Sequence, residues 1–200
     1  MIPLEDAQSH VMKNIKTLND ENVHLLQGRN RAITEPILSN ESIPPFDNTA
    51  VDGYAVKAID TKGATQETPI SLTVLETIAA GKPPTFAIQS GECSKIMTGA
   101  PIPDGADAVV MVERTEQQEN GSVVAIEEEV SKGQHIRRSG EDLEPGDLVI
   151  PQGTILNAAH LGLLASLGIY QITTVRIPTV GVFSTGDELI EGSQELKPGQ

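Results

Sequence analysis

The stretch at residues 44–56, PPFDNTAVDGYAV, restricts the backbone more than any other part of the sequence. Its two leading prolines hold the chain extended and remove two amide donors, so a helix cannot run through this point. Asp47–Asn48 and Asp52–Gly53 are typical of turns, and the residues after Gly53 are typical of a strand. The pattern therefore displays carboxylates on stiff backbone, as in a site for a metal or a polar ligand. A tight turn capped by its own Asx side chains is the alternative.

Composition limits the core and the classes of partner. Aromatic residues make up 2% of the chain, so the core must be mostly aliphatic, and we expect Phe46 to anchor residues 44–56 on it. The formal net charge of −14 argues against nucleic acid or an anionic membrane as the main partner. The single cysteine, Cys93, excludes an internal disulfide and suits a reducing compartment. With no signal peptide or spanning segment recognisable, we expect a soluble cytoplasmic protein.

Hydrophobic periodicity predicts an α+β fold with an inserted small antiparallel β domain. An amphipathic helix is expected from Leu4 through Val11 to Ile15, and another is expected after Asn157 as its N-cap. A short strand is predicted at 23–26 and a short helix at 29–37. Apolar runs bounded by Gly, Pro or Asn predict the strands of the β domain, at 70–79, 93–97, 108–112 and 122–126.

Turn signals predict how some of these strands pair. Asn120–Gly121 is a strong hairpin signal, which would join the strand at 109–112 to the one at 123–124. Residues 148–150 and 154–156 are expected to form a hairpin-like unit around Pro151. A further strand is predicted at 175–182, interrupted by Pro178.

A second informative stretch, IMTGAPIP, occupies residues 96–103. We expect a strand to end at Thr98, with Gly99 permitting an unusual backbone angle and two prolines stiffening the loop. Free amides and a hydroxyl at a strand end suit an oxyanion or a phosphate. Thr98 is therefore a candidate ligand contact, and a hydroxyl that only caps the turn is the alternative.

The segment HIRRSGEDL, residues 135–143, holds the strongest local positive charge in this acidic chain. Arg137 and Arg138 can grip phosphate oxygens with a fork geometry that lysine lacks. Glu141 and Asp142 follow directly, so an internal network of ion pairs is an equally good interpretation. Strand alternation also lets only one of the two arginines face a given cleft.

The segment FSTGDEL, residues 183–189, follows the last predicted strand. Ligands in α/β sheets gather beyond the carboxyl ends of strands, which makes this loop a candidate site. Ser184 and Thr185 can donate hydrogen bonds, and Gly186 allows close approach. Asp187 and Glu188 can hold a hard divalent cation through oxygen.

Together these motifs resemble the signatures of the MoeA family, the molybdopterin molybdenumtransferases, which include the E domain of gephyrin. The family pattern P-x-F-D-N-S-A-M-D-G-Y-A-V matches residues 44–56, with Thr49 in place of serine and Val51 in place of methionine. Matches at 96–103, 136–142 and 183–189 follow in the family's order. Four ordered matches over most of the chain are far more specific than one motif.

The resemblance implies a multi-domain, elongated α+β chain that ends at the start of an α/β, MogA-like domain. It divides the chain into a discontinuous linker and dimerisation domain at 21–44 and 143–172, and an inserted β-rich domain at 45–142. The N-terminal helix and the first part of the α/β molybdopterin-binding domain take 1–20 and 173–200. MoeA proteins continue beyond this length, so we expect a fragment of a longer protein.

The implied activity is insertion of molybdenum from molybdate into adenylylated molybdopterin, with release of AMP and assistance from Mg²⁺. The resemblance gives catalytic roles to Asp52, Thr98 and Glu188. The expected metal ligands are Asp52, Asp142, Asp187 and Glu188, and the expected substrate contacts are Thr98, Arg137, Arg138, Ser184, Thr185 and Gly186. A homodimer is implied, with a MogA-type molybdopterin adenylyltransferase as a further partner. The alternative function is a non-catalytic, dimerising scaffold that presents the β domain to another protein.

Overall fold

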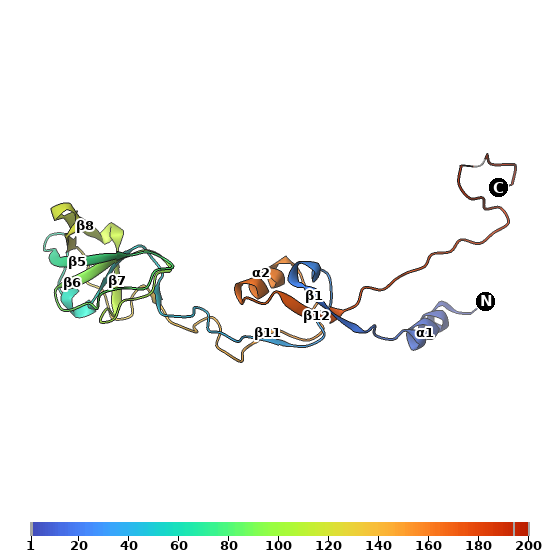
Figure 1. Ribbon diagram of the computed structural model, residues 1–200, viewed down its shortest axis with the longest axis horizontal. Coiled ribbons are helices and arrows are strands. Elements are labelled where there is room, and N and C mark those ends of the chain that lie inside the picture. The colour runs from blue at the N-terminus through green and yellow to red at the C-terminus, as the bar shows by residue number, and fades with distance from the viewer. Residues whose placement is uncertain (1, 194, 200) are drawn as a thin grey trace. The chain divides into compact units, whose positions relative to one another are not determined.

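The computed structural model describes residues 2–193 and 195–199 and divides the chain into two compact units (Figure 1). Unit 1 is formed by Met1–Pro36 and Ile150–Gln200, and unit 2 by the intervening Ile37–Val149. Helices and a mixed sheet make this an α+β protein, as the sequence predicts. None of the described helices is long and apolar enough to cross a bilayer.

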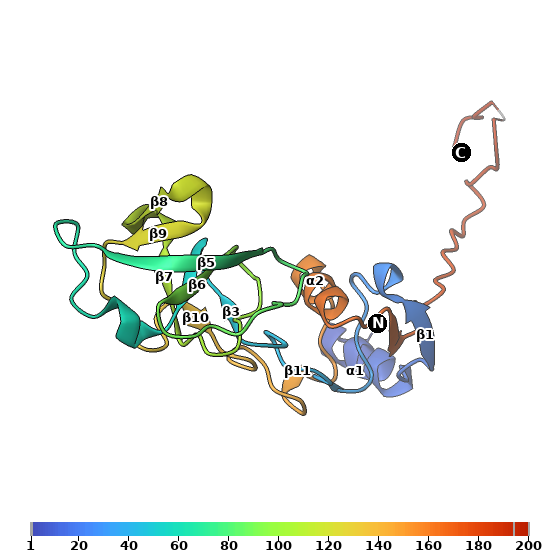
Figure 2. The same ribbon diagram turned by 60° about the vertical axis from the view of Figure 1, so that its left-hand side comes forward.

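Unit 2 is built on a six-stranded sheet of order β7-β4-β6-β5-β9-β8 (Figure 2). Neighbouring strands are antiparallel, except that β5 and β6 are parallel. The sheet consists of β4 (Gly53–Val56), β5 (Ile70–Ile78), β6 (Glu92–Ile96), β7 (Ala108–Met111), β8 (Thr115–Gln118) and β9 (Val123–Ile126). The apolar runs predicted as strands at 70–79, 93–97, 108–112 and 122–126 are therefore confirmed, with one-residue differences at their ends.

The sheet carries an apolar cluster on each face because successive side chains of a strand point to opposite sides. In β4, Tyr54 and Val56 belong to one cluster and Ala55 to the other, and all four residues of the strand are buried. Among the described residues the core is mostly aliphatic, with Cys93 and Tyr54 added, and the Tyr54 hydroxyl accepts a hydrogen bond from Gln117 Nε2 at 2.8 Å. The expectation that Phe46 anchors on this core is wrong: the side chain is 44% exposed.

Two short ladders complete unit 2 and its boundary with unit 1. Strand β3 (Asn48–Thr49) pairs antiparallel with β10 (Ile136–Arg137), and β2 (Ile37–Leu38) pairs with β11 (Leu148–Ile150). Single 3₁₀ turns lie at η2 (Ala58–Thr61), η3 (Val112–Arg114) and η4 (Glu119–Gly121). Strand β3 is short, but it is the element on which the candidate site is assembled.

Unit 1 pairs the two ends of the chain that flank unit 2. Strand β1 (Asp20–His24) runs antiparallel to β12 (Gln171–Val175), next to the 3₁₀ turn η1 (Leu25–Gln27) and helix α2 (Ala158–Ser166). Asn157 caps α2, as predicted, and His160 completes a capping box with it. Helix α1 (Leu4–Asn14) also forms where its amphipathic pattern predicts, and it contains no buried residue.

Two predicted strand pairings are wrong. One misses a strand with a polar sequence, and the other pairs two segments only because they are neighbours in the sequence. The Asn120–Gly121 turn joins β9 to β8, whereas β7 pairs with β4. Residues 115–118 are polar enough to suggest a solvated loop, yet they form an exposed edge strand. Ile155 bridges Ala32 instead of pairing with residues 148–150.

Two predictions in unit 1 also fail. Residues 29–37 form no helix, because Ala32 and Ile33 take part in β-bridges to Ile155 and Thr174. The strand predicted at 175–182 instead ends at Val175, and residues 176–189 are exposed, without regular secondary structure. Pro178, which lacks an amide donor, lies within that segment.

Candidate functional site

Strand β3 brings three of the four sequence motifs together within unit 2. On one side, Thr49 O accepts from the Gly99 amide at 2.9 Å, and the Thr49 amide donates to Ala100 O at 3.1 Å. On the other side, β10 places Ile136 opposite Thr49 and Arg137 opposite Asn48. Residues 44–56 therefore form the frame between the Thr98 loop and the arginine segment, which are far apart in sequence.

Asp52 and Thr98 form the most specific contact of this assembly. Asp52 Oδ1 accepts hydrogen bonds from the Thr98 amide at 2.7 Å and from Thr98 Oγ1 at 2.8 Å. These two donors, the amide first, hold the pKa of the Asp52 carboxyl below its ordinary value, and the charge of Lys95 contributes further. Both side chains are exposed, so the site offers an ionised carboxylate to solvent at neutral pH.

The backbone around Asp52 is held from two directions. Gly53 packs so closely on β7 that an added Cβ would lie 2.0 Å from the Val110 carbonyl oxygen. Thr49 closes the preceding turn, since its hydroxyl donates to Val51 O at 2.7 Å and accepts from the Val51 amide at 3.1 Å. A serine could make the same two bonds, which explains why threonine is a mild change at this position in the motif.

The arginine segment forms ion pairs, which was one of the two interpretations of its sequence. Arg137 Nε donates to Glu141 Oε1 at 2.7 Å, and its Nη2 donates to Asp142 Oδ2 at 2.6 Å. Arg138 Nη1 pairs with Asp47 Oδ2. Each guanidinium therefore has an acidic partner, and Asp142 already accepts from one of them. Contacts of Arg137, Arg138 and Asp142 with a substrate or metal stay predictions.

Asp47 was predicted as a displayed carboxylate, but its partners in this network were not predicted. Its Oδ1 accepts from the Ser139 amide at 2.8 Å, and this bond, followed by the Arg138 side chain, lowers the pKa of the Asp47 carboxyl. Asp47 and Arg138 are 91 residues apart, so no local pattern pairs them. The available signal was an acid at a turn of one motif and two adjacent arginines in another.

The described residues of unit 2 could hold a cation through a single carboxylate, but not through a cluster of protein ligands. Within the described ranges 2–193 and 195–199, no three His, Cys, Asp or Glu side chains form a group that could hold a metal ion. Asp52 nevertheless has its second carboxylate oxygen, Oδ2, free of any protein donor among the described residues. Because Mg²⁺ commonly binds one or two carboxylates together with substrate phosphates, this arrangement fits a cation that arrives with a phosphorylated ligand.

The fourth motif, residues 183–189, belongs to unit 1. It lies in the exposed segment after β12, where the Leu189 amide donates to Gly186 O at 3.1 Å. The Glu188 carboxylate folds back over Gly186, so an added Cβ there would lie 2.3 Å from Glu188 Oε1. The roles proposed for Ser184, Thr185, Gly186, Asp187 and Glu188 stay predictions.

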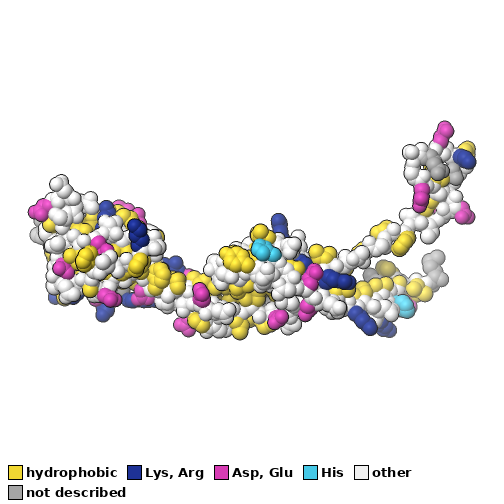
Figure 3. All heavy atoms as spheres, viewed as in Figure 1, with side chains coloured by type: hydrophobic (Ala, Val, Ile, Leu, Met, Phe, Trp, Pro, Cys, Tyr) yellow, Lys and Arg dark blue, Asp and Glu magenta, His cyan; other side chains and the backbone are white. Residues whose placement is uncertain are grey.

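Acidic and basic side chains are mixed on the surface, although the chain as a whole is strongly acidic. On the face shown in Figure 3, Asp and Glu side chains are scattered and interspersed with Lys and Arg. The net charge of −14 is therefore not concentrated in one patch of that face. An anionic ligand would meet individual side chains and backbone amides rather than a uniformly repelling field.

Comparison with known proteins identifies the family. The family model described as MoeA N-terminal region (domain I and II) matches residues 2–168. The chain therefore belongs to the MoeA family, as its motifs indicate.

Individual relatives agree with this assignment. The chain is 40% identical over 202 residues to molybdopterin molybdenumtransferase 2 of Mycobacterium tuberculosis, covering 100% of this chain and 49% of that protein. It is 36% identical over 201 residues to molybdopterin molybdenumtransferase of Bacillus subtilis, covering 100% and 47%. The crystal structure of the molybdopterin biosynthesis moeA protein from Pyrococcus horikoshii OT3 matches with a TM-score of 0.87 at 36% identity, covering 100% and 52%. The chain thus spans about half the length of the curated relatives it matches.

Proposed function

We propose that this chain supplies the N-terminal part of a molybdopterin molybdenumtransferase, which inserts molybdenum from molybdate into adenylylated molybdopterin and releases AMP. The observation that carries the proposal is the Asp52–Thr98 pair, an exposed ionised carboxylate at the junction of two family motifs. Relatives that are 36–40% identical over the whole chain and bear this enzyme name support the assignment.

In this proposal, Asp52 would be the residue of unit 2 that holds Mg²⁺, through its free Oδ2. The ion would neutralise charge on the phosphoanhydride that is cleaved when AMP leaves. The Thr98 amide and hydroxyl fix the carboxylate in one orientation and keep it ionised. Asp142, Asp187 and Glu188 are further proposed metal ligands, with Glu188 also catalytic, and Arg137, Arg138, Ser184, Thr185 and Gly186 are proposed substrate contacts.

Isothermal titration with adenylylated molybdopterin, with and without Mg²⁺, tests this role. The expected result is saturable binding that requires Mg²⁺ and is lost in Asp52→Asn. Asp60→Asn is the matched control, because Asp60 also accepts from a hydroxyl and an amide, of Ser90 and Gly91, at 2.9 Å each. Equal loss in both variants, or binding unaffected by Asp52→Asn, would contradict the proposal.

The proposed assembly is a homodimer, and helix α1 supports it. Leu4 and Val11 lie on the apolar stripe of α1 and Ile15 is its C-cap residue, yet each is more than half exposed, at 68%, 55% and 61%. A second copy of the chain would cover them. Val11→Glu is expected to convert a dimer into a monomer in analytical ultracentrifugation, whereas Ser9→Glu, a polar position on the same helix, should not. A dimer that survives Val11→Glu would remove this helix from the interface.

We also propose a partner enzyme, a cellular compartment and a domain division for this protein. A MogA-type molybdopterin adenylyltransferase is the proposed source of the substrate, and the cytoplasm is the proposed compartment. The domain division inferred from the family resemblance is also proposed, with boundaries at 20/21, 44/45, 142/143 and 172/173.

A further inference from the structure

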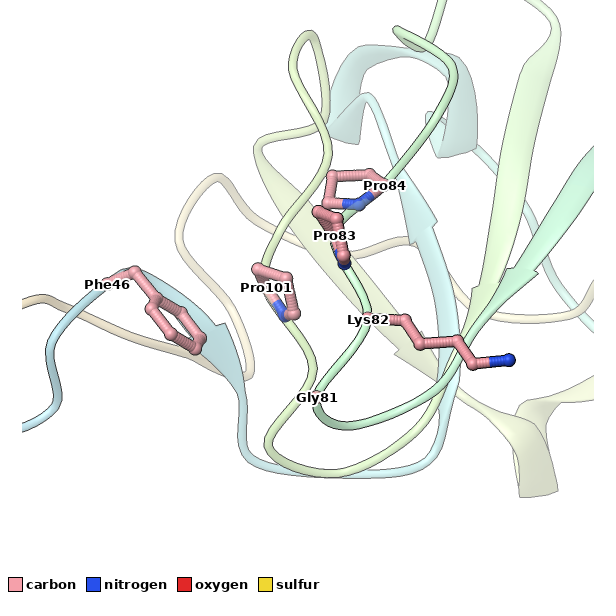
Figure 4. A pocket seen from close by; sticks show the side chains of 6 residues that line it. All are labelled: Phe46, Gly81, Lys82, Pro83, Pro84 and Pro101. Atoms are coloured by element: carbon pink, nitrogen blue, oxygen red, sulfur yellow. The ribbon is translucent and has the colours of Figure 1, made fainter.

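An apolar pocket lies on the loop that also carries Thr98 of the candidate site. It has a volume of about 410 Å³ and is lined by Phe46, Gly81, Lys82, Pro83, Pro84 and Pro101 (Figure 4). The Phe46 ring lies opposite Pro101, while the Lys82 ammonium points away from Phe46 (Figure 4). The walls that face the opening are therefore hydrocarbon, and Phe46 is a large apolar side chain left 44% exposed among them.

The walls are stiff before any ligand arrives. Three of the lining residues are prolines, whose φ angle is held by the ring. The loop that carries Pro83 and Pro84 is fixed on both sides: the Lys82 amide donates to Ala79 O at 3.1 Å, and Glu76 Oε1 accepts from the Thr85 and Phe86 amides. A preformed apolar wall loses little conformational entropy when it binds, which favours binding.

The pocket and the Asp52–Thr98 pair share one loop. Thr98 and Pro101 are three residues apart, so at most roughly 11 Å of extended backbone separates them. The Ile102 amide donates to Asp47 O at 3.0 Å, which ties this loop to the residue next to Phe46. A ligand whose phosphate is held at Asp52 therefore reaches the pocket if it carries a ring a few bonds further on.

We propose that this pocket is the ring subsite of the candidate site, and that it takes the flat heteroaromatic ring of a phosphorylated ligand. This inference rests on the function proposed above, in which a phosphorylated ligand binds at Asp52. A fused bicyclic ring suits the volume, stacks on Phe46 and contacts the hydrogens of the prolines. Pterin and adenine are both such rings, so the chemistry of the walls admits either.

The sequence provides a clean reporter, because it contains no tryptophan. Phe46→Trp keeps an aromatic face at the wall and adds the only indole of the chain. Its emission is titrated with pterin-6-carboxylate, with AMP, and with ribose 5-phosphate, which carries a phosphate but no aromatic ring. The expected result is saturable quenching by one or both ring compounds and none by ribose 5-phosphate. The ring compound with the higher affinity shows whether the pocket takes the pterin or the adenine.

A second series measures the contribution of Phe46 itself. Pterin-6-carboxylate fluorescence, free of indole emission from the protein, reports binding to Phe46→Ala and to Phe86→Ala. Phe86 is the matched control, since it is 53% exposed in the same unit but does not line the pocket. Loss of a stacking face is expected to weaken binding roughly 5- to 100-fold in Phe46→Ala and to leave Phe86→Ala unchanged.

The outcomes separate this inference from the function on which it rests. If no ring compound quenches Phe46→Trp while adenylylated molybdopterin still binds in an Asp52-dependent manner, the subsite is wrong and the function stands. If rings bind through Phe46 but Asp52→Asn leaves binding of adenylylated molybdopterin intact, the subsite stands and the role of Asp52 is wrong. An emission shift that depends only on protein concentration would mean that another copy of the chain covers the pocket, which overturns the inference.

Discussion

Asp52 and Asp47 lie five residues apart in one motif, and they differ in whether their carboxylate forms an ion pair. Both carboxyls have a lowered pKa, and in both the largest cause is a backbone amide, from Thr98 or from Ser139. The second partner differs: Asp52 accepts from a neutral hydroxyl, whereas Asp47 pairs with the Arg138 guanidinium. Among the described residues, Asp52 therefore forms no ion pair, although Lys95 lies near enough to act on it through its charge, whereas Asp47 is paired with an arginine.

The difference shows that a lowered pKa alone does not mark a ligand site. A carboxylate held by neutral donors remains available to a cation, while one held by arginine is already neutralised. The same holds for Asp142, which accepts from Arg137 at 2.6 Å. Of the carboxylates gathered around β3, the structure favours Asp52 as the one that can bind a cation without first breaking an ion pair.

We expect Gly53→Ala to affect the protein more than any other change proposed here, because it would displace the strand that follows Asp52. The added Cβ would lie 2.0 Å from the Val110 carbonyl oxygen, a backbone atom that cannot rotate away. We expect the free energy of unfolding to fall by about 3 kcal/mol or more, measured by urea denaturation. Gly162→Ala is the control: its Cβ meets nothing within 4 Å on α2, so stability should rise by up to about 1 kcal/mol. Equal effects of the two variants would contradict the packing argument.

Thr98→Val removes the hydroxyl donor from Asp52 and leaves the amide donor in place. The pKa of the Asp52 carboxyl should rise part of the way towards its ordinary value of 3.8, because the amide, the larger cause, remains. Carboxyl chemical shifts followed by NMR during a pH titration measure this change. Mg²⁺-dependent binding of adenylylated molybdopterin should weaken roughly 2- to 10-fold. Thr98→Ser should restore both quantities, and a pKa unchanged in the valine variant would refute the assigned bond.

Arg138→Met tests the other half of the comparison, with a smaller expected effect. The pKa of Asp47 should rise but stay below 3.8, since the Ser139 amide still donates. The pKa of Asp52 should not move. If the arginine serves only the ion pair, affinity for adenylylated molybdopterin is also unchanged. A marked loss of affinity with an unaltered Asp52 would instead make Arg138 a substrate contact.

Acid should weaken the fold slightly, through both halves of the network. Asp47, Asp52 and Glu141 have a lower pKa in the folded protein than ordinary carboxyls. The unfolded chain therefore binds more protons at low pH, and the free energy of unfolding decreases as pH falls from about 4 through the folded pKa values. Urea denaturation at a series of pH values measures this slope, which should be shallower in Asp52→Asn. An identical slope in that variant would show that Asp52 does not contribute.

Local signals predicted the local structure well. The strands β5 and β9 follow from apolar runs with turn residues at their ends, and helix α2 follows from the Asn157 cap. Each of these signals lies within a few residues of the element it specifies, so one sequence is enough to recognise it. The Asn120–Gly121 turn was also correctly placed, although one of the strands it joins was not.

Structural features that depend on contacts between residues far apart in the chain could not be predicted from the sequence. The pairing of β7 with β4 instead of β9 depends on competition among several strands for the same edges. The choice between a free and an ion-paired Arg138 depended on Asp47, and the exposure of Phe46 depended on how residues far apart in the chain pack around it. None of these outcomes can be predicted from the spacing of residues within one motif.

By itself the sequence determined the family through the order of its motifs, the α+β class through hydrophobic periodicity, and Asp52 and Thr98 as candidate site residues, because residue type and turn chemistry are local properties. The tertiary structure was needed to show which carboxylate pairs with an arginine and where an apolar wall lies near the other. Hydrogen bonds and ion pairs form between side chains that folding brings together, and strand β3 brings together segments that the sequence keeps apart.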